Sequence, residues 1–307
     1  MSIKITVTGD LGSGKSTVCK ELNKKFGLQI FSTGTIQRKI AVEMGMSTFE
    51  LNKYMETHPE IDQLIDGELV KLSDSAENMA IDSRMAWHFV KNTYDVFLTT
   101  DETVAAQRVV SDKRGPSERY TNVQHALSSL KARKISENYR YKEKYDVDCY
   151  DLSNYDLILD TTDVSPDYVA DTIMQQYSMR KPDDSIPVFL ISPLCLYPTR
   201  SIRTPSLQTI DEYCSFISEG KPVQPVQIVV SNGFYYIYDG HNRAIAFYRL
   251  KMPLVPCTMI AQNNDLVAGG LSADEYVEGE FELSKAYDWE NQNGFSFLTY
   301  PYQNQHH

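Results

Sequence analysis

Residues 9 to 17 read Gly-Asp-Leu-Gly-Ser-Gly-Lys-Ser-Thr and fit the phosphate-binding pattern GxxxxGK[ST]. In such a loop, backbone N–H groups converge on phosphate oxygens at a helix N-terminus. Lys15 would bridge the β and γ phosphates of ATP, and Ser16 would hold Mg²⁺. The structural alternative is a Gly/Ser turn that caps an ordinary helix. We predict that ATP is bound by Gly9, Asp10, Leu11, Gly12, Ser13, Gly14, Lys15, Ser16 and Thr17.

The loop needs a strand before it and a helix after it. The alternating run 3–7 predicts the strand, and 16–26 predicts the helix. Short apolar runs at 28–31, 79–82, 95–98 and 155–160 predict further strands, the later ones buried and parallel. Helices are expected at 35–43, 48–54 and 167–179. This alternation predicts a three-layer α/β/α fold with a parallel sheet.

Two segments at predicted strand ends carry side chains suited to a second phosphate. Ser32 and Gly34 follow a strand, and Arg38 would lie one turn inside the next helix, where its guanidinium can grip an acceptor monophosphate. Asp82 ends another strand and suits a Mg²⁺-bound water, with Arg84 two residues on. The alternative role for Asp82 is a helix cap.

A basic helix-loop-helix region follows, containing Arg108, Arg114, Arg119, Arg133 and Arg140. A mobile lid of arginines would neutralise the charge that phosphoryl transfer builds on equatorial oxygens, and would exclude water. We assign catalytic roles to Lys15, Arg114, Arg133 and Arg140. Any one arginine of such a helix can instead be a solvated surface residue.

The second half begins after a polar, proline-flanked segment, 181–186, which predicts a linker. Strands are expected at 187–191, 226–230, 234–238 and 255–260, and helices at 209–218 and 244–250, with an Asn232-Gly233 hairpin turn. The predicted domains are therefore 1–180, 187–262 and an acidic, aromatic tail, 263–307, whose packing the sequence does not determine.

Composition limits the classes of function. The chain has 307 residues and a formal net charge of −11, which argues against a protein that grips nucleic acid through its phosphates. Ten Lys/Arg against four Asp/Glu lie between Arg108 and Lys144, a local basic patch suited to a small phosphorylated ligand. No apolar stretch reaches membrane-spanning length, and the five cysteines lack metal spacing, so we expect a cytoplasmic protein with reduced thiols.

Residues 1 to about 176 resemble the archaeal-type cytidylate kinases. The matching segments are 9–17, Ser32-Thr33-Gly34 with Arg38, 44–47, 58–62, 81–86, 136–141, 145–148 and 151–157. The resemblance implies phosphotransfer from ATP to CMP, with Arg38 and Arg84 on the acceptor phosphate and Arg133 and Arg140 on the transferring group. Ser83 stands where the family often has glycine, which leaves the preferred base or sugar open.

Residues 187 to about 262 resemble the ParB/sulfiredoxin superfamily, through 218–226 and 238–244. The resemblance implies a second nucleotide or phosphate pocket formed by Glu219, Asp239, Gly240, His241 and Arg243. Sulfiredoxin chemistry is disfavoured because His241 stands where the nucleophilic cysteine would be. Two alternatives to a CMP kinase stay open: a regulatory or defence protein that senses nucleotide, and a kinase of a small compound such as free serine, with Glu219 as base. Homo-oligomerisation also stays open.

Overall fold

The computed structural model describes residues 2–55, 57–112, 120–181, 186–200 and 207–301. Contacts between Cα atoms divide the chain into two compact units, Met1–Ile186 and Pro187–His307. Each unit contains strands that pair with one another and buried apolar residues of its own, so each is described by itself.

The first unit is built on a parallel sheet. Its strands are β1 (Lys4–Gly9), β2 (Gln29–Ser32), β3 (Met79–Asp82), β4 (Tyr94–Thr99) and β5 (Leu157–Asp160), in the order β2-β3-β1-β4-β5. All four pairings are parallel, which confirms the predicted sheet. Because parallel strands place their carboxyl ends at one edge, Gly9, Ser32 and Asp82 reach the same edge.

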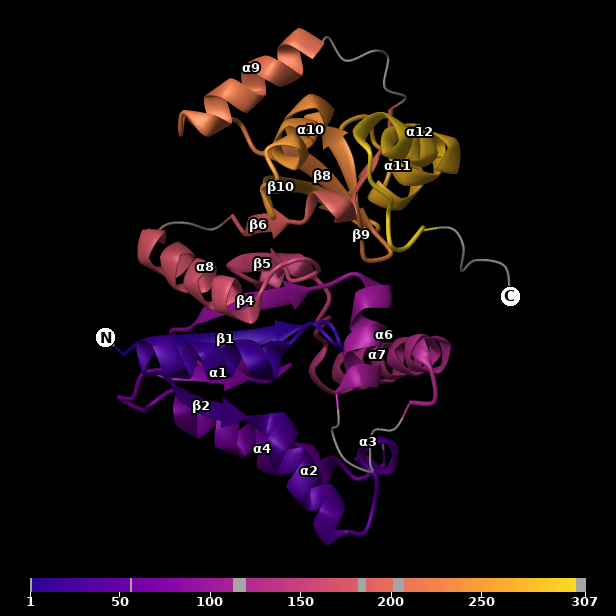
Figure 1. The fold of residues 1–307 in the computed structure, drawn as a ribbon. Coiled ribbons are helices and arrows are strands. Elements are labelled where there is room, and N and C mark those ends of the chain that lie inside the picture. The colour runs from indigo at the N-terminus through magenta and orange to yellow at the C-terminus, as the bar shows by residue number, and fades with distance from the viewer. Residues whose placement is uncertain (1, 56, 113–119, 182–185, 201–206, 302–307) are drawn as a thin grey trace. The chain divides into compact units, whose positions relative to one another are not determined.

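Helices cover both faces of this sheet, as the fold class predicts. On one face α1 (Lys15–Phe26) contacts α8 (Pro166–Met179) and the strands β1, β2 and β3 (Figure 1). Alternate residues of β3 face the other way: Met79 and Ile81 pack with Leu69 of α4 (Pro59–Leu72) and with Ala86 of α5 (Ala86–Phe89). Helix α4 was not predicted from the sequence.

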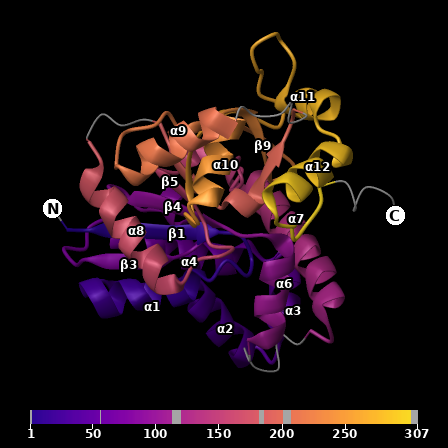
Figure 2. The ribbon, with the colours of Figure 1, turned by 45° about the horizontal axis from the view of Figure 1, so that its top comes forward.

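The remaining elements of the first unit flank the sheet edge. They are α2 (Thr33–Glu43), α3 (Thr48–Met55), α6 (Glu102–Ser111), α7 (Val123–Tyr145) and a 3-10 turn, η1 (Leu152–Asn154). Figures 1 and 2 show α6 and α7 lying side by side, joined by an apolar cluster that includes Ala106, Val109, Ala126 and Leu130. The basic region predicted as a helix-loop-helix is therefore two packed helices.

The second unit has a mixed sheet. Its strands are β6 (Val188–Ile191), β7 (Leu196–Pro198), β8 (Val226–Ser231), β9 (Phe234–Asp239) and β10 (Val255–Gln262), in the order β6-β10-β8-β9-β7. Strands β8 and β9 form the predicted antiparallel hairpin, with Asn232 and Gly233 at φ 51° and 81°. Helices α9 (Leu207–Ser218) and α10 (His241–Arg249) pack on each other, and η2 (Pro193–Cys195) contacts α10.

The tail, whose packing the sequence left open, is part of this second unit. It forms α11 (Ala273–Glu280), which contacts β8 and β10, and α12 (Leu283–Asn293), which contacts β7. Both helices are yellow in Figures 1 and 2. Trp289 and Phe297 are buried, and the Phe297 ring stacks on Tyr197 with centroids 4.6 Å apart. Burial of these aromatic rings accounts for the packing of an otherwise acidic segment.

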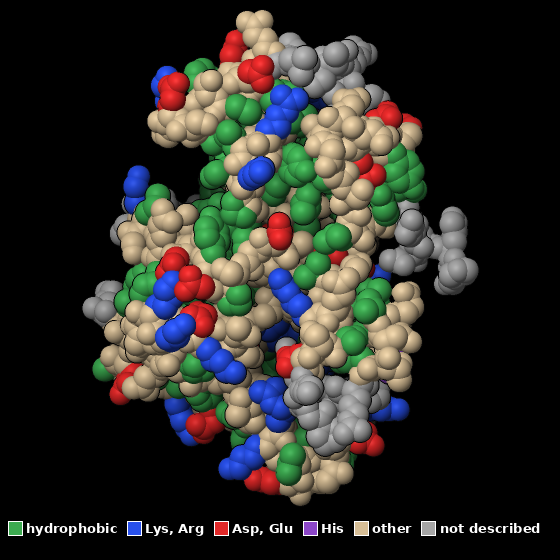
Figure 3. All heavy atoms as spheres, viewed as in Figure 1, with side chains coloured by type: hydrophobic (Ala, Val, Ile, Leu, Met, Phe, Trp, Pro, Cys, Tyr) green, Lys and Arg blue, Asp and Glu red, His purple; other side chains and the backbone are tan. Residues whose placement is uncertain are grey.

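Basic and acidic side chains intermingle on the face of each unit shown in Figure 3. Across the described ranges, no helix combines the length and the apolar character that crossing a bilayer needs.

Candidate functional site

The phosphate loop connects β1 to α1 in the order that its chemistry requires. Gly14 stands before the first helical residue, Lys15, in a left-handed conformation with φ 86°. Gly9 ends β1 at φ 140°, and a Cβ there would lie 2.1 Å from the carbonyl oxygen of Leu98. Glycine is therefore required at position 9 by the close approach of β4.

Lys15 folds back over the loop. Its Nζ donates to the carbonyl oxygens of Gly9 (2.9 Å) and Asp10 (2.7 Å). Burial, with the charge of nearby Arg84 as a second cause, lowers the pKa of Lys15 to about 7. A phosphate group beside this amine would stabilise its charged form, so the loop is matched to an anionic ligand.

Asp82, Ser16 and Ser32 bring hydroxyl and carboxylate oxygens together at the sheet edge. Ser16 Oγ donates to Asp82 Oδ2 at 2.6 Å, and Ser32 Oγ lies 3.4 Å from the same oxygen. Asp82 is buried at the end of β3, where the phosphate loop packs beside it. Hydroxyl and carboxylate oxygens are the ligands that Mg²⁺ prefers, so Ser16 and Asp82 fit a magnesium ion between the loop and β3.

One cavity joins the two halves of the predicted site. Its lining includes Arg38 of α2, Arg133 of α7 and the phosphate-loop residues Lys15 and Ser16. The predicted residues that line it are Leu11, Gly12, Gly14, Lys15, Ser16, Gly34, Arg38, Asp82, Arg84 and Arg133. Arg38 is exposed, and its Nη2 donates to Thr35 Oγ1 at 3.1 Å.

Other predicted residues lie apart from this lining. Arg140 is buried, with its Nη2 3.4 Å from the Tyr141 hydroxyl, and it does not line the cavity. Arg108 holds the carbonyl oxygen of Thr161 at 2.5 Å and has a structural position. Arg114 and Arg119 lie outside the described residues. Ser32 does not line the cavity, but its Oγ lies 3.4 Å from Asp82 Oδ2, which does.

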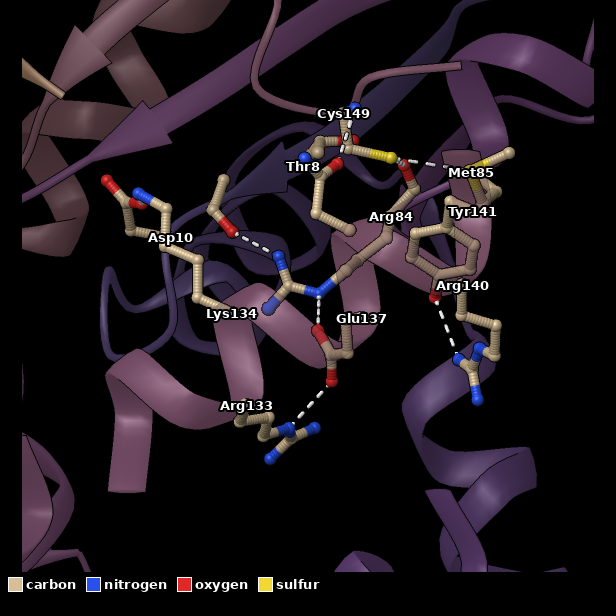
Figure 4. Close-up of polar contacts among 12 residues, drawn as sticks. Thr8, Asp10, Arg84, Met85, Arg133, Lys134, Glu137, Arg140, Tyr141 and Cys149 are labelled. Carbon is tan, nitrogen blue, oxygen red and sulfur yellow. Dashed lines mark hydrogen bonds and ion pairs between the residues drawn. The ribbon is translucent and has the colours of Figure 1, made fainter. Parts of the chain in front are cut away.

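Glu137 connects two of the predicted arginines, and sequence reasoning missed it. Its Oε2 lies 2.5 Å from Arg84 Nε, and its Oε1 accepts a hydrogen bond from Arg133 Nε at 2.7 Å (Figure 4). Burial alone would raise the pKa of Glu137, but Arg84 and Arg133 outweigh it and hold this pKa at about 2. The available signal was an acid four residues after Arg133 on a basic helix.

Helix α4 contributes further lining residues that the sequence did not reveal. They are Asp62, Ile65, Asp66 and Leu69, on a helix that was not predicted. Asp62 is 5% exposed, and Lys144 Nζ lies 3.4 Å from its Oδ2. Asp66 accepts a hydrogen bond from the Tyr145 hydroxyl, and burial raises the pKa of Asp66. The α4 wall is thus partly apolar and partly acidic.

The second unit has a cavity of its own at the start of α10. Asp239, Gly240, His241 and Arg243 line it, as do residues the sequence did not single out, including Arg200, Lys285 and Trp289. Gly240 has φ 100°, and a Cβ there would lie 2.7 Å from the Arg243 guanidinium. Arg243 Nη2 pairs with Asp239 at 2.7 Å.

Two residues predicted for this second cavity, His241 and Glu219, differ in position: His241 lines it and Glu219 does not. His241 accepts a hydrogen bond at Nε2 from the backbone N–H of Thr199 (3.3 Å). Burial, then Arg200, lowers the pKa of His241 to about 4, so it is a neutral residue rather than a cation. Glu219 is not among the lining residues; it is more than half exposed and pairs with Lys221 at 2.6 Å.

A cytidylate kinase from Thermoplasma volcanium is 34% identical to this chain over 178 residues, which span 57% of this chain and 90% of that protein. This chain belongs to the cytidylate kinase family. A family profile described as an AAA domain matches residues 5–127. The first of the two resemblances seen in the sequence is thereby confirmed.

Two further likenesses are more partial. A protein named S-adenosylmethionine-dependent nucleotide dehydratase, from Lacinutrix mariniflava, is 32% identical over 191 residues, which span 61% of this chain but 38% of that protein. The crystal structure of sulfiredoxin from Arabidopsis thaliana covers 24% of this chain and 82% of that one, at 19% identity and a TM-score of 0.22. The ParB/sulfiredoxin resemblance of the second unit stays a prediction.

Proposed function

We propose that the first unit transfers a phosphoryl group from ATP to CMP or a related nucleoside monophosphate. The observation that carries this proposal is the single cavity in which the phosphate-loop residues Lys15 and Ser16 face Gly34, Arg38 and Arg84. A donor phosphate on the loop and an acceptor phosphate beside Arg38 would then lie in line. The membership of the cytidylate kinase family supports the same reaction.

The residues divide the chemistry between them by position and charge. Lys15 would bind the donor's β and γ phosphates, while Arg38 and Arg84 would hold the acceptor phosphate. Arg133 would face the transferring group. Ser16 and Asp82 would hold Mg²⁺, which would neutralise negative charge on the phosphates during transfer. Catalysis is then positioning and electrostatics, without a covalent intermediate.

The α4 wall supports an acceptor base that carries an amino group. Within the described residues, Asp62 Oδ2 accepts no hydrogen bond, although Lys144 Nζ lies 3.4 Å from it. Buried atoms of this kind are normally paired. A carboxylate oxygen that can accept a hydrogen bond matches the amino group of cytosine or adenine, a donor group that uracil lacks. Arg140 does not line the cavity, so it is given no role on the transferring phosphate.

Turnover with a panel of monophosphates tests the proposal. We expect CMP phosphorylation with ATP and Mg²⁺, loss of turnover in Lys15→Ala, and a raised acceptor KM in Arg38→Ala. Lys20→Ala and Lys39→Ala are matched controls, because both lysines are exposed on the same helices. ATP binding without transfer to any monophosphate would favour a nucleotide sensor instead.

For the second unit, we propose a pocket for a phosphorylated ligand at the start of α10, with Arg200 and Arg243 as its cations. A free-serine-like kinase loses its suggested base, because Glu219 does not line this cavity. Nucleotide titration of the full chain by calorimetry would show one site that Lys15→Ala weakens and one that Arg200→Ala weakens. Arg249→Ala, an exposed arginine of the same unit, is the control. Binding that Arg200→Ala leaves unchanged would contradict this pocket.

A further inference from the structure

A single buried carboxylate lies between two arginines of the cavity. Glu137 is 6% exposed, and each of its oxygens contacts a different arginine, Arg84 or Arg133. Arg84 follows β3, whereas Arg133 and Glu137 lie one turn apart on α7. Figure 4 shows the carboxylate centred between the two guanidinium groups. Glu137 therefore ties the sheet edge to the helix that carries Arg133.

The contacts of Arg84 involve its Nε and Nη1 atoms and leave Nη2 available to bind a phosphate. Glu137 contacts Arg84 and Arg133 at Nε, which is the atom nearest the side-chain stem. Arg84 Nη1 donates to the carbonyl oxygen of Gly9 at 2.8 Å, whereas Arg84 Nη2 forms no hydrogen bond with the described residues. Because Arg84 and Arg133 both line the cavity, the carboxylate fixes their direction without covering the groups that bind phosphate.

The charges of the lining residues show why a carboxylate is needed there. The lining contains equal numbers of basic and acidic side chains. The basic ones are Lys15, Arg38, Arg84 and Arg133, and the acidic ones are Asp62, Asp66, Asp82 and Glu137. Arg84 and Arg133 would repel each other if nothing lay between them. Because Arg84 and Arg133 hold the pKa of Glu137 at about 2, the carboxylate is ionised at neutral pH and balances part of their charge.

We infer that Glu137 is a positioning residue for phosphoryl transfer, an inference that rests on the proposed kinase function of this cavity. It keeps hold of the Nε atoms of Arg84 and Arg133 throughout the reaction. The Nη groups of both arginines then meet the acceptor phosphate and the transferring group in a fixed orientation. Orientation of this kind lowers the barrier to transfer more than it strengthens the binding of either substrate.

Kinetics separate this role from a purely structural one. In Glu137→Gln we expect kcat to fall by roughly 100-fold, with KM for ATP and CMP changed by less than about threefold. Glu143→Gln makes the same charge change on an exposed position of α7 and should behave as wild type. Glu137→Asp keeps the charge, but its shorter side chain moves the carboxylate away from the two arginines, so kcat should also fall. Wild-type kcat in Glu137→Asp or Glu137→Gln would overturn the inference.

A double-variant cycle tests whether Glu137 acts through the arginines. Glu137→Gln should cost at least threefold less in an Arg133→Gln background than alone, because one of its two partners is already missing. Fully additive losses would show that Glu137 acts by another route, and would overturn the inference.

Arginine NMR provides a readout that does not depend on activity. The Nε–H signals of Arg84 and Arg133 should be protected from solvent exchange at neutral pH in wild type and Glu143→Gln, and unprotected in Glu137→Gln. Protection that persists in Glu137→Gln overturns the inference even if CMP is phosphorylated. A wild-type protein that shows protection but no transfer instead contradicts the proposed function and leaves the orientation of the arginines established.

Discussion

Ser16 Oγ lies 2.6 Å from Asp82 Oδ2, so the first turn of α1 and the last residue of β3 share a hydrogen bond. These residues are 66 positions apart in the sequence. The parallel pairing of β1 with β3 brings them together, because the loop after β1 and the end of β3 reach the same sheet edge.

The first prediction concerns magnesium at this pair. Asp82→Asn keeps the shape of the side chain but removes its charge, so the Mg²⁺ concentration for half-maximal activity should rise by roughly 10- to 100-fold. The measurement is initial rate against Mg²⁺ at fixed ATP and CMP. Asp74→Asn, at an exposed site, is the control. An unchanged Mg²⁺ curve in Asp82→Asn would remove Asp82 from the metal site.

The second prediction concerns proton uptake by Lys15. With a pKa of about 7, this amine is mostly neutral at pH 8 in the free protein. A bound phosphate favours the charged form and raises that pKa, so ADP binding at pH 8 should take up close to about one proton. Calorimetry in two buffers with different ionisation enthalpies measures this number. Uptake should vanish in Lys15→Met and persist in Lys20→Met; equal uptake in both variants would exclude Lys15 as the source.

The third prediction concerns Asp95, which is structural. Thr6 Oγ donates to Asp95 Oδ1 at 2.7 Å, and burial raises the pKa of Asp95 to about 6. Because the folded-state pKa exceeds the unfolded value, the contribution of Asp95 to the free energy of unfolding is most favourable below about pH 4 and is lost as the pH rises through 6. Asp95→Asn should therefore be more stable than wild type at pH 8, by on the order of 2 kcal/mol, and gain nothing at pH 4.

Urea denaturation at both pH values measures this difference. Asp74→Asn should change neither value, because Asp74 is exposed. A variant that is less stable than wild type at pH 8 would show that the charge of Asp95 stabilises the fold.

Local sequence patterns predicted the elements that place the phosphate loop. The run before Gly9 and the helix after Gly14 are where the pattern requires them, and Met79–Asp82 is a strand with the predicted bounds. The predictions for these segments are correct because their apolar residues are close together in the sequence and recur with one clear period. The Asn232-Gly233 hairpin succeeds because both residues tolerate positive φ.

Features that depend on distant contacts were missed. In the sequence, Glu137 is simply an acidic residue on a basic helix. Its pairing with Arg84, which is 53 positions earlier in the chain, becomes evident only in the folded structure. Helix α4 contributes Asp62 to the cavity, but its apolar residues pack against elements far along the chain. In the tail, the structural role of Trp289 is evident only from its burial in the second unit. The roles of these residues depend on contacts between segments that are distant in the sequence, and a local hydrophobic pattern does not encode such contacts.

The last prediction concerns His241 in the second unit. Its pKa of about 4 lies below the usual value of 6.5, because the ring is buried and Arg200 is near. The unfolded chain therefore binds a proton that the folded unit does not, and the free energy of unfolding falls as the pH drops from 6.5 towards 4. The loss should reach at most about 3 kcal/mol. Amide exchange within β9 and α10 at pH 7 and pH 5 measures it for this unit alone.

His241→Gln isolates the cause, because glutamine can still accept the hydrogen bond from Thr199 N–H but does not titrate in this range. The variant should show the same exchange protection at both pH values once intrinsic rates are corrected. His125→Gln, at an exposed site in the first unit, should keep the wild-type pH dependence. An undiminished pH slope in His241→Gln would assign the acid sensitivity of this unit to another group and would contradict a neutral, hydrogen-bonded His241 at the start of α10.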